Sequence, residues 1–226
     1  YYMFGNRTKY KNVQEAMTVW KDYMVSMGFG YKLGIDLPGE KRGLIPNAPF
    51  YDKAYRGSWN GLTVISISIG QGEVNATPLQ IANLGATIAN RGYFITPHVV
   101  KQIQDEQIDT LYTRRRYTKV EARHYETVVQ GMRRAVLAGT CRKANIPGIE
   151  VCGKTGTAQN RGHDHSVFMG FAPMNDPKIA IAVYVENGGW GALMMEQYLN
   201  GKLSPESEKL AEMYQQRHIG YGTADR

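Results

Sequence analysis

Residues 148–158 read Gly-Ile-Glu-Val-Cys-Gly-Lys-Thr-Gly-Thr-Ala. The first eight of them, Gly148 to Thr155, match the phosphate-binding pattern G-x-x-x-x-G-K-[ST] in every fixed letter. That pattern needs a loop whose N–H groups hold phosphates and a helix that begins at the lysine. Here Ile149 to Cys152 favour a strand, and residues 155–162 contain too much Gly and Thr to open a stable helix. The sequence therefore predicts a β-strand, with a nucleotide-binding loop as the alternative.

Two further extended runs follow the first one at short intervals. The three runs cover Ile149 to Thr157, Val167 to Phe171 and Ile179 to Val185. Short breakers separate them, such as the segment from Pro173 to Pro177, whereas a parallel crossover needs about a dozen residues or more. We therefore expect an antiparallel meander of three strands.

Helices are expected before this sheet, because apolar residues recur there at intervals of three and four. They cover residues 13–27, 78–89 and 119–138. The second helix begins with a capping box formed by Thr77 and Gln80, and the third with one formed by Thr118 and Glu121. Helices followed by an antiparallel sheet indicate an α+β fold, in which helices flank the sheet.

Three other segments show partial patterns. Leu62 to Ile69 alternates in part and predicts a short extended segment, and Thr96 to Tyr112 predicts one or two surface strands. A last helix is expected from Leu193 to Leu199. We divide the chain into one folded part, residues 1–200, and a polar C-terminal tail, residues 201–226.

Composition excludes several classes of protein. With 42% hydrophobic residues the chain is not intrinsically disordered, and two cysteines are too few for a disulfide scaffold. The net charge is +7, and the densest basic run is Arg114-Arg115-Arg116. This run is short and lies in a polar stretch typical of a solvated loop, so no nucleic-acid partner is expected. His163-Asp164-His165 offers too few ligands for a metal site, so no metal is expected either. No apolar stretch reaches the roughly 20 residues of a membrane span.

Lys154, Thr155, Gly156 and Thr157 are the candidate binding residues. On a strand at the edge of a sheet, the ammonium group and the two hydroxyl groups can hold a carboxylate. Gly156 lets another backbone approach closely, and an open strand edge can pair with an extended peptide. A Lys-Thr-Gly element in this setting is typical of the active-serine enzymes that bind penicillin.

Other stretches of the chain resemble the class B penicillin-binding proteins, from residue 1 to about residue 200. The matching stretches are Gly34 to Glu40, Ser68 to Gly72, Thr77 to Gln80, Gly153 to Ala158, Phe168 to Pro173 and Val185 to Gly189. Their order along the chain makes the resemblance specific. It implies the fold shared by these transpeptidases and the serine β-lactamases, of which this chain would hold only a part.

The resemblance also implies peptidoglycan D,D-transpeptidation, with no cofactor. In that reaction a serine attacks a stem peptide that ends in D-Ala-D-Ala, releases the last D-Ala, and passes the acyl group to an amine. By position, Lys154 would tune the protonation network and attract the substrate carboxylate, which Thr155 and Thr157 would contact. The backbone N–H of Thr157 would donate to the oxyanion, and β-lactam antibiotics would acylate the same serine.

The sequence departs from the family in its catalytic serine. No serine here has a lysine three positions later, so the Ser-x-x-Lys nucleophile is missing. One literal Ser-x-Asn occurs, Ser58-Trp59-Asn60, but it lies too close to Lys154 in sequence and is rejected as the second catalytic element. We expect both elements upstream of Tyr1, and we expect residues 1–226 alone to be inactive and poorly soluble.

The resemblance further implies a protein anchored in the inner membrane, with its catalytic domain in the periplasm. A membrane glycosyltransferase of the rod-shape system would be its partner. A β-lactam sensor and a β-lactamase have a similar Lys-Thr-Gly strand, and both stay open as alternatives.

Overall fold

The structure is a computed structural model, and it describes residues 2–104 and 106–188. The predicted helix from Leu193 to Leu199 and the tail from residue 201 lie outside the described residues. The α-helices are α1 (Tyr2–Gly5), α2 (Val13–Ser26), α3 (Ala48–Tyr55), α4 (Pro78–Ala89) and α5 (Ala122–Ala138). The strands are β1 (Tyr93–Phe94), β2 (Arg116–Tyr117), β3 (Cys152–Ala158), β4 (His165–Ala172) and β5 (Ile179–Val185). Short 3₁₀ helices are η1 (Ile65–Ile69), η2 (Thr110–Tyr112) and η3 (Arg142–Ala144).

The main sheet is the predicted antiparallel meander, in the order β3-β4-β5. Lys154 lies opposite Met169, and Gly156 lies opposite Val167. The first strand begins at Cys152, three residues later than predicted. Ile149 instead forms an isolated bridge with Ile146, because Gly148 has a positive φ and turns the chain between them. No helix begins at Lys154, so the nucleotide-loop alternative is wrong.

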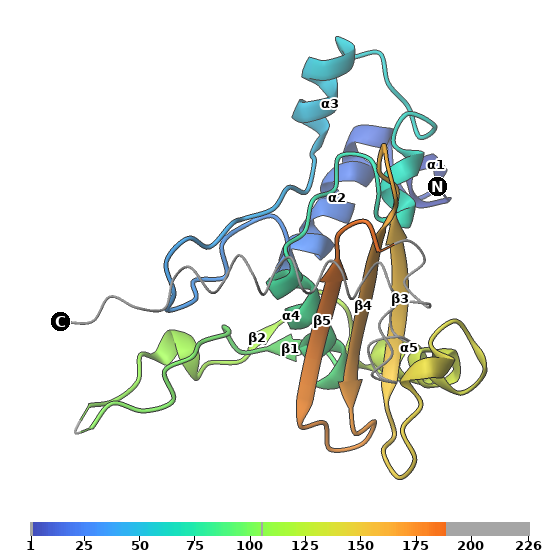
Figure 1. The fold of residues 1–226 in the computed structure, drawn as a ribbon. Helices are drawn as coiled ribbons and strands as arrows, with labels where there is room; N and C mark the ends of the chain where they lie inside the picture. Colours follow the sequence, from blue (N-terminus) through green and yellow to red (C-terminus); the bar gives the residue numbers. More distant parts are fainter. Residues whose placement is uncertain (1, 105, 189–226) are drawn as a thin grey trace, which may run out of the picture.

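Helices α4 and α5 pack on one face of this sheet and give the α+β architecture (Figure 1). The cluster that joins them to the sheet consists of Ile88, Ala89, Tyr125, Val129, Met132, Cys152, Phe171 and Met174. Cys152 is fully buried, and this burial raises the pKa of its thiol to about 11. The thiol is therefore neutral at physiological pH and packs as a small apolar group.

On the other face of the sheet, the ring of Phe168 lies over a pair of glycines. Gly153 and Gly170 are directly opposite each other on β3 and β4. A Cβ atom on Gly153 would lie 2.6 Å from Phe168 Cε2, and one on Gly170 would lie 2.7 Å from Phe168 Cζ. Only glycine leaves room for the ring at these two positions, so the contact fixes the neighbouring strands together.

A second core lies around α2 and α3, away from the sheet. Its buried members are Phe4, Tyr10, Val13, Ala16, Met17, Ala48, Tyr51, Trp59, Val64 and Ile67. Helix α2 matches its prediction closely, and its first turn is capped by the side chain of Asn12, which accepts the N–H of Glu15 at 2.8 Å. Within the described part of the chain, no helix is both long and apolar enough to cross a bilayer.

The predicted extended segment from Leu62 to Ile69 is wrong, because its last part forms the 3₁₀ helix η1. Of the three isoleucines of η1, Ile65 and Ile69 are exposed and Ile67 is buried. The backbone satisfies its hydrogen bonds locally, and Gly70 ends the helix in the left-handed conformation. In the described part of the chain no strand pairs with these residues, and alternating isoleucines alone are not sufficient to form a β-strand.

The surface strands predicted within Thr96 to Tyr112 are also absent from the described residues. Strands β1 and β2 flank this segment instead, and it extends from them as an arm (Figure 1). The N–H groups of Val99 and Val100 donate to the carboxylate of Asp36, at 3.0 and 2.8 Å. Because a side chain satisfies these backbone groups, they do not pair with another strand.

The two predicted capping boxes have different outcomes. The box at Thr77 and Gln80 is confirmed, with both of its hydrogen bonds present. The box at Thr118 and Glu121 is wrong, because Glu121 itself is the N-cap of α5 and makes no side-chain cap. The hydroxyl of Thr118 instead lies 2.7 Å from that of Tyr125, one turn into the helix.

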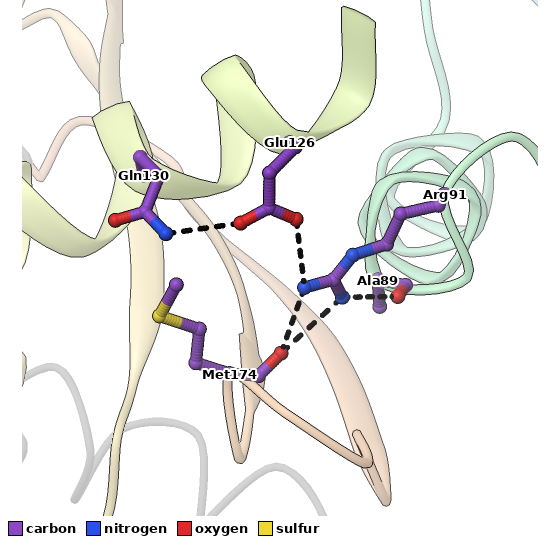
Figure 2. A network of polar contacts seen from close by, with 5 residues as sticks. All are labelled: Ala89, Arg91, Glu126, Gln130 and Met174. Carbon is purple, nitrogen blue, oxygen red and sulfur yellow. Dashed lines mark hydrogen bonds and ion pairs between the residues drawn. The ribbon is translucent and has the colours of Figure 1, made fainter. Parts of the chain in front are cut away.

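Arg91 joins α4, α5 and the loop after β4 (Figure 2). Its guanidinium group donates to the carbonyl of Ala89 at 2.6 Å and to that of Met174 at 3.2 Å. It also forms an ion pair at 3.4 Å with Glu126, which in turn accepts a hydrogen bond from Gln130. One side chain thus satisfies carbonyl groups at the ends of two different elements.

We expect Arg91→Met to lower the free energy of unfolding by about 1–3 kcal/mol, because the carbonyl of Met174 loses its donor. Glu126→Gln is the matched control. Glu126 is 55% exposed, so its ion pair should contribute only about 0–1 kcal/mol. Urea unfolding of the full-length protein measures both, and equal effects of the two substitutions would contradict the assigned role of the carbonyl contacts.

Gly170→Ala should destabilise the protein by about 1–3 kcal/mol, since the added methyl group meets the Phe168 ring and the carbonyl of Cys152. Gly131→Ala, within α5, should instead stabilise it by about 1 kcal/mol, because no atom lies near that Cβ position and Ala favours the helix. Thermal unfolding of the two variants should therefore shift in opposite directions. A neutral Gly170→Ala would show that the ring does not need the glycine.

Candidate functional site

The candidate site lies along the edge of β3 that is not paired with β4. Lys154 and Thr157 are exposed on this strand, and Thr155 is half-buried. Within residues 2–104 and 106–188, β3 has β4 as its only neighbour in the sheet. All four predicted binding residues, 154–157, therefore lie together on one accessible strand edge.

The side-chain contacts of the strand show which backbone groups point to this edge. The carbonyl of Thr155 accepts a hydrogen bond from Lys154 Nζ at 2.6 Å. The carbonyl oxygen of Thr157 lies 3.5 Å from the side-chain nitrogen Nε2 of Gln71. In an antiparallel ladder the N–H and C=O of one residue point to the same side. The N–H of Thr157 is therefore directed to the open edge, where the sequence analysis expects an oxyanion donor.

Gly156 has a different reason to be glycine than Gly153 and Gly170. A Cβ atom at Gly156 would meet only the Cβ of Val167, at an ordinary distance of 3.6 Å. Packing among the described residues therefore does not require glycine here. The missing side chain leaves space above the strand, as expected if another backbone approaches it.

Lys154 has no ion-pair partner among the described residues. The one hydrogen bond of its ammonium group within the described part of the chain is to the carbonyl of Thr155. Since this contact is exposed, a ligand carboxylate can replace it at little cost. The strand can thus bind an anion with a lysine and threonine hydroxyl groups.

Thr140 belongs to the site, although the sequence analysis missed it. The hydroxyl of Thr155 donates to the hydroxyl of Thr140 at 2.9 Å. Thr140 follows the end of α5, fifteen residues before its partner. Its only sequence signal was its place next to the helix-ending Gly139, which does not identify a contact with β3.

Gln71 reaches the far end of the same strand from the loop after η1. This loop is held from its other side, because the hydroxyl of the buried Tyr51 donates to the carboxylate of Glu73. Burial, together with the hydrogen bond to Glu73, raises the pKa of Tyr51, so the phenol stays protonated. The stretch Ser68 to Gly72 thus forms one end of the site.

The stretch from Gly34 to Glu40 has a structural role. The carboxylate of Glu40 accepts the N–H groups of Leu33, Gly34 and Ile35 at 2.6, 3.0 and 3.3 Å. Asp36 extends the same loop to the arm, and its pKa is lowered, chiefly by the N–H of Val100. The carboxylates of this stretch therefore hold loops together.

The rejected Ser-x-Asn match lies in the second core. Trp59 is buried beside Tyr51, and its indole N–H donates to Asp52 at 2.6 Å. Asn60 accepts the N–H of Leu62. These contacts belong to the surroundings of α3 and not to β3.

His165, the first residue of β4, and Asp164 just before it have partners of their own. The ring nitrogen Nδ1 of His165 accepts the N–H of Asn187 at 3.0 Å, and the ring packs against Tyr184. Asp164 accepts the N–H of Asn160 at 3.3 Å. In the described part of the chain, no group of three His, Cys, Asp or Glu side chains comes together as a metal site.

A cavity of about 460 Å³ opens elsewhere, between the end of α2 and β2. Its lining consists of Asp22, Val25, Ser26, Tyr31, Arg116, Tyr117 and Lys119. Lys119 already binds Asp22 through its ammonium group and Ser26 through its backbone N–H. None of the predicted site residues lines this cavity, so it is not the candidate site.

Comparison with known proteins gives the family of the chain. The family model described as "Penicillin binding protein transpeptidase domain" matches residues 9–207. The peptidoglycan D,D-transpeptidase MrdA of Acinetobacter baumannii is 36% identical over 205 residues, which are 79% of this chain and 29% of that protein. This chain spans about a third of the length of the curated relatives it matches.

Solved structures agree with this assignment. Penicillin-binding protein 2 of Pseudomonas aeruginosa, in complex with WCK 5153, has a TM-score of 0.70 and 34% identity. The match covers 84% of this chain and 44% of that one. A chain from a peptidoglycan synthase complex that coordinates polymerization and crosslinking has a TM-score of 0.64 and 29% identity, over 83% of this chain and 37% of its own. The predicted fold is confirmed, and the chain belongs to the penicillin-binding protein transpeptidase family, in its class B branch of the penicillin-binding protein 2 type.

Proposed function

We propose that this chain is the C-terminal part of the transpeptidase domain of a peptidoglycan D,D-transpeptidase. The observation that carries the proposal is the open edge of β3, where Lys154 and the backbone N–H of Thr157 lie within one short stretch. The relatives named peptidoglycan D,D-transpeptidase support the same activity.

The substrate is a stem peptide that ends in D-Ala-D-Ala. Its extended backbone pairs with the open edge of β3, and its terminal carboxylate binds Lys154 and the hydroxyl groups of Thr155 and Thr157. This places the carbonyl of the penultimate D-Ala near the N–H of Thr157. That N–H stabilises the negative charge that forms on the carbonyl oxygen during attack.

The nucleophile is a serine that lies outside these 226 residues. Its oxygen forms a bond to the penultimate carbonyl carbon, the peptide C–N bond breaks, and the last D-Ala leaves as an amine that takes up a proton. An amine of a second stem peptide then attacks the ester, which restores the serine and forms the cross-link. The absence of Ser-x-x-Lys from this sequence is consistent with that arrangement, and residues 1–226 alone are then inactive.

The partners follow from the same proposal. β-Lactam antibiotics acylate the same serine, because their ring amide and carboxylate resemble the peptide end. A membrane glycosyltransferase of the rod-shape system supplies the glycan strands, and the relative found in a synthase complex for polymerization and crosslinking supports such a partner. The protein is then anchored in the inner membrane and acts in the periplasm.

Benzylpenicillin should add once to the full-length protein, and denaturing intact-mass spectrometry measures this directly. A single adduct that persists for many minutes is the expected result. A protein without an adduct would overturn the proposal. Rapid loss of the adduct by hydrolysis would indicate a β-lactamase, and a stable adduct with no turnover of a D-Ala-D-Ala peptide would indicate a sensor.

Lys154→Met should slow acylation of the full-length protein by benzylpenicillin about 100-fold or more, because the charge that attracts the carboxylate is lost. Lys178→Met is the matched control. Its side chain is 70% exposed and paired with Asp176 just before β5, the strand at the opposite edge of the sheet from β3, so the acylation rate should not change. Equal rates for the wild type and Lys154→Met would exclude Lys154 from the site.

A further inference from the structure

The contact between the hydroxyl groups of Thr140 and Thr155 joins two segments with different surroundings. Thr155 lies on β3 and is half-buried, whereas Thr140 is exposed in the connection between α5 and η3. The two oxygen atoms are 2.9 Å apart, which is a hydrogen bond of normal length. No backbone ladder brings these residues together, so the side chains themselves make the connection.

The backbone on both sides of Thr140 is firmly held. The N–H groups of Gly139 and Cys141 both donate to the carbonyl of Ala135, each at 3.0 Å. Cys141 is only 1% exposed and packs with Phe168 and Val136 in the core beside the sheet. Thr140 therefore presents its hydroxyl from a fixed position, even though its side chain is exposed.

We propose that Thr140 is a positioning residue for carboxylate recognition by Thr155, an inference that rests on the proposed function. Without ligand, the Thr155 hydroxyl donates its one hydrogen to Thr140. When a carboxylate binds, that hydrogen turns to the carboxylate, and the Thr140 hydroxyl donates to the Thr155 oxygen in its place. The heavy atoms need not move, because only hydrogen atoms rotate about C–O bonds.

The reversed arrangement strengthens the contact with the ligand. A hydroxyl that accepts a hydrogen bond becomes a better donor, so Thr140 increases the interaction between Thr155 and the carboxylate. The Thr140 hydrogen is available for this purpose. Among the described residues, the other polar contact of the Thr140 hydroxyl is the sulfur of Cys141 at 3.9 Å, and sulfur is a weak partner both as donor and as acceptor, so this contact is lost at small cost.

The test compares Thr140→Val with Thr140→Ser in the full-length protein, using benzylpenicillin and its methyl ester as probes. Valine keeps the shape and removes the hydroxyl, whereas serine keeps the hydroxyl. Thr140→Val should lower the second-order acylation constant for benzylpenicillin about threefold to tenfold, mostly through weaker initial binding. Thr140→Ser should restore it, and acylation by the methyl ester, which lacks the anionic carboxylate, should be nearly the same in all three proteins.

A double-mutant cycle with Thr155→Val supplies the second readout. In that background Thr140→Val should have no further effect, because the hydroxyl through which it acts is gone. An unchanged acylation constant in Thr140→Val, or an equal loss for the acid and the ester, would overturn the inference while the proposed function stands. A wild-type protein that forms no adduct would overturn the proposed function itself.

Discussion

The ring of Phe168 on the Gly153–Gly170 pair determines where the groups that β3 contributes to the candidate site lie. The contact fixes the register of β3 against β4, because only that pair of glycines leaves space for the ring. A slip by one residue would exchange the two faces of β3. Lys154 would then point to the opposite face, and the N–H of Thr157 would point to β4 instead of the open edge. The chemistry of the edge therefore depends on packing inside the sheet.

Local patterns predicted the elements whose hydrogen bonds are local or whose sequence is mainly apolar. The α4 cap depends only on Thr77 and Gln80, and strands β4 and β5 are mainly apolar runs between turn formers, whereas β3 also carries Lys154 and two threonines. The predictions failed where the conformation of a segment depends on residues far away in the sequence. Asp36 binds the N–H of Val99 from 63 residues away, and the isoleucines of η1 pair with no strand among the described residues. Neither fact is visible in a window of ten residues.

The site was predictable in part. The resemblance identified residues 154–157, and the structure places them on one open edge. The resemblance did not show that the glycines of this region have different roles. Gly153 is required by the ring of Phe168, whereas no described neighbour requires glycine at position 156. Thr140 could not be predicted at all. A threonine after a helix is ordinary, and its contact with Thr155 exists only because the chain returns along β3.

An edge strand has backbone support on one side only, so its position at the open side depends on side chains. Two such contacts to β3 come from the described residues: Thr140 meets Thr155 from the end of α5, and Gln71 meets Thr157 from the loop after η1. Each contact leaves the backbone N–H groups at the edge accessible. A second strand paired with this edge would instead occupy those N–H groups. A site that must receive a peptide backbone needs this form of support, because a strand held by another ladder has no donors left to offer. The polar contacts around β3 thus allow one strand to be both well positioned and open.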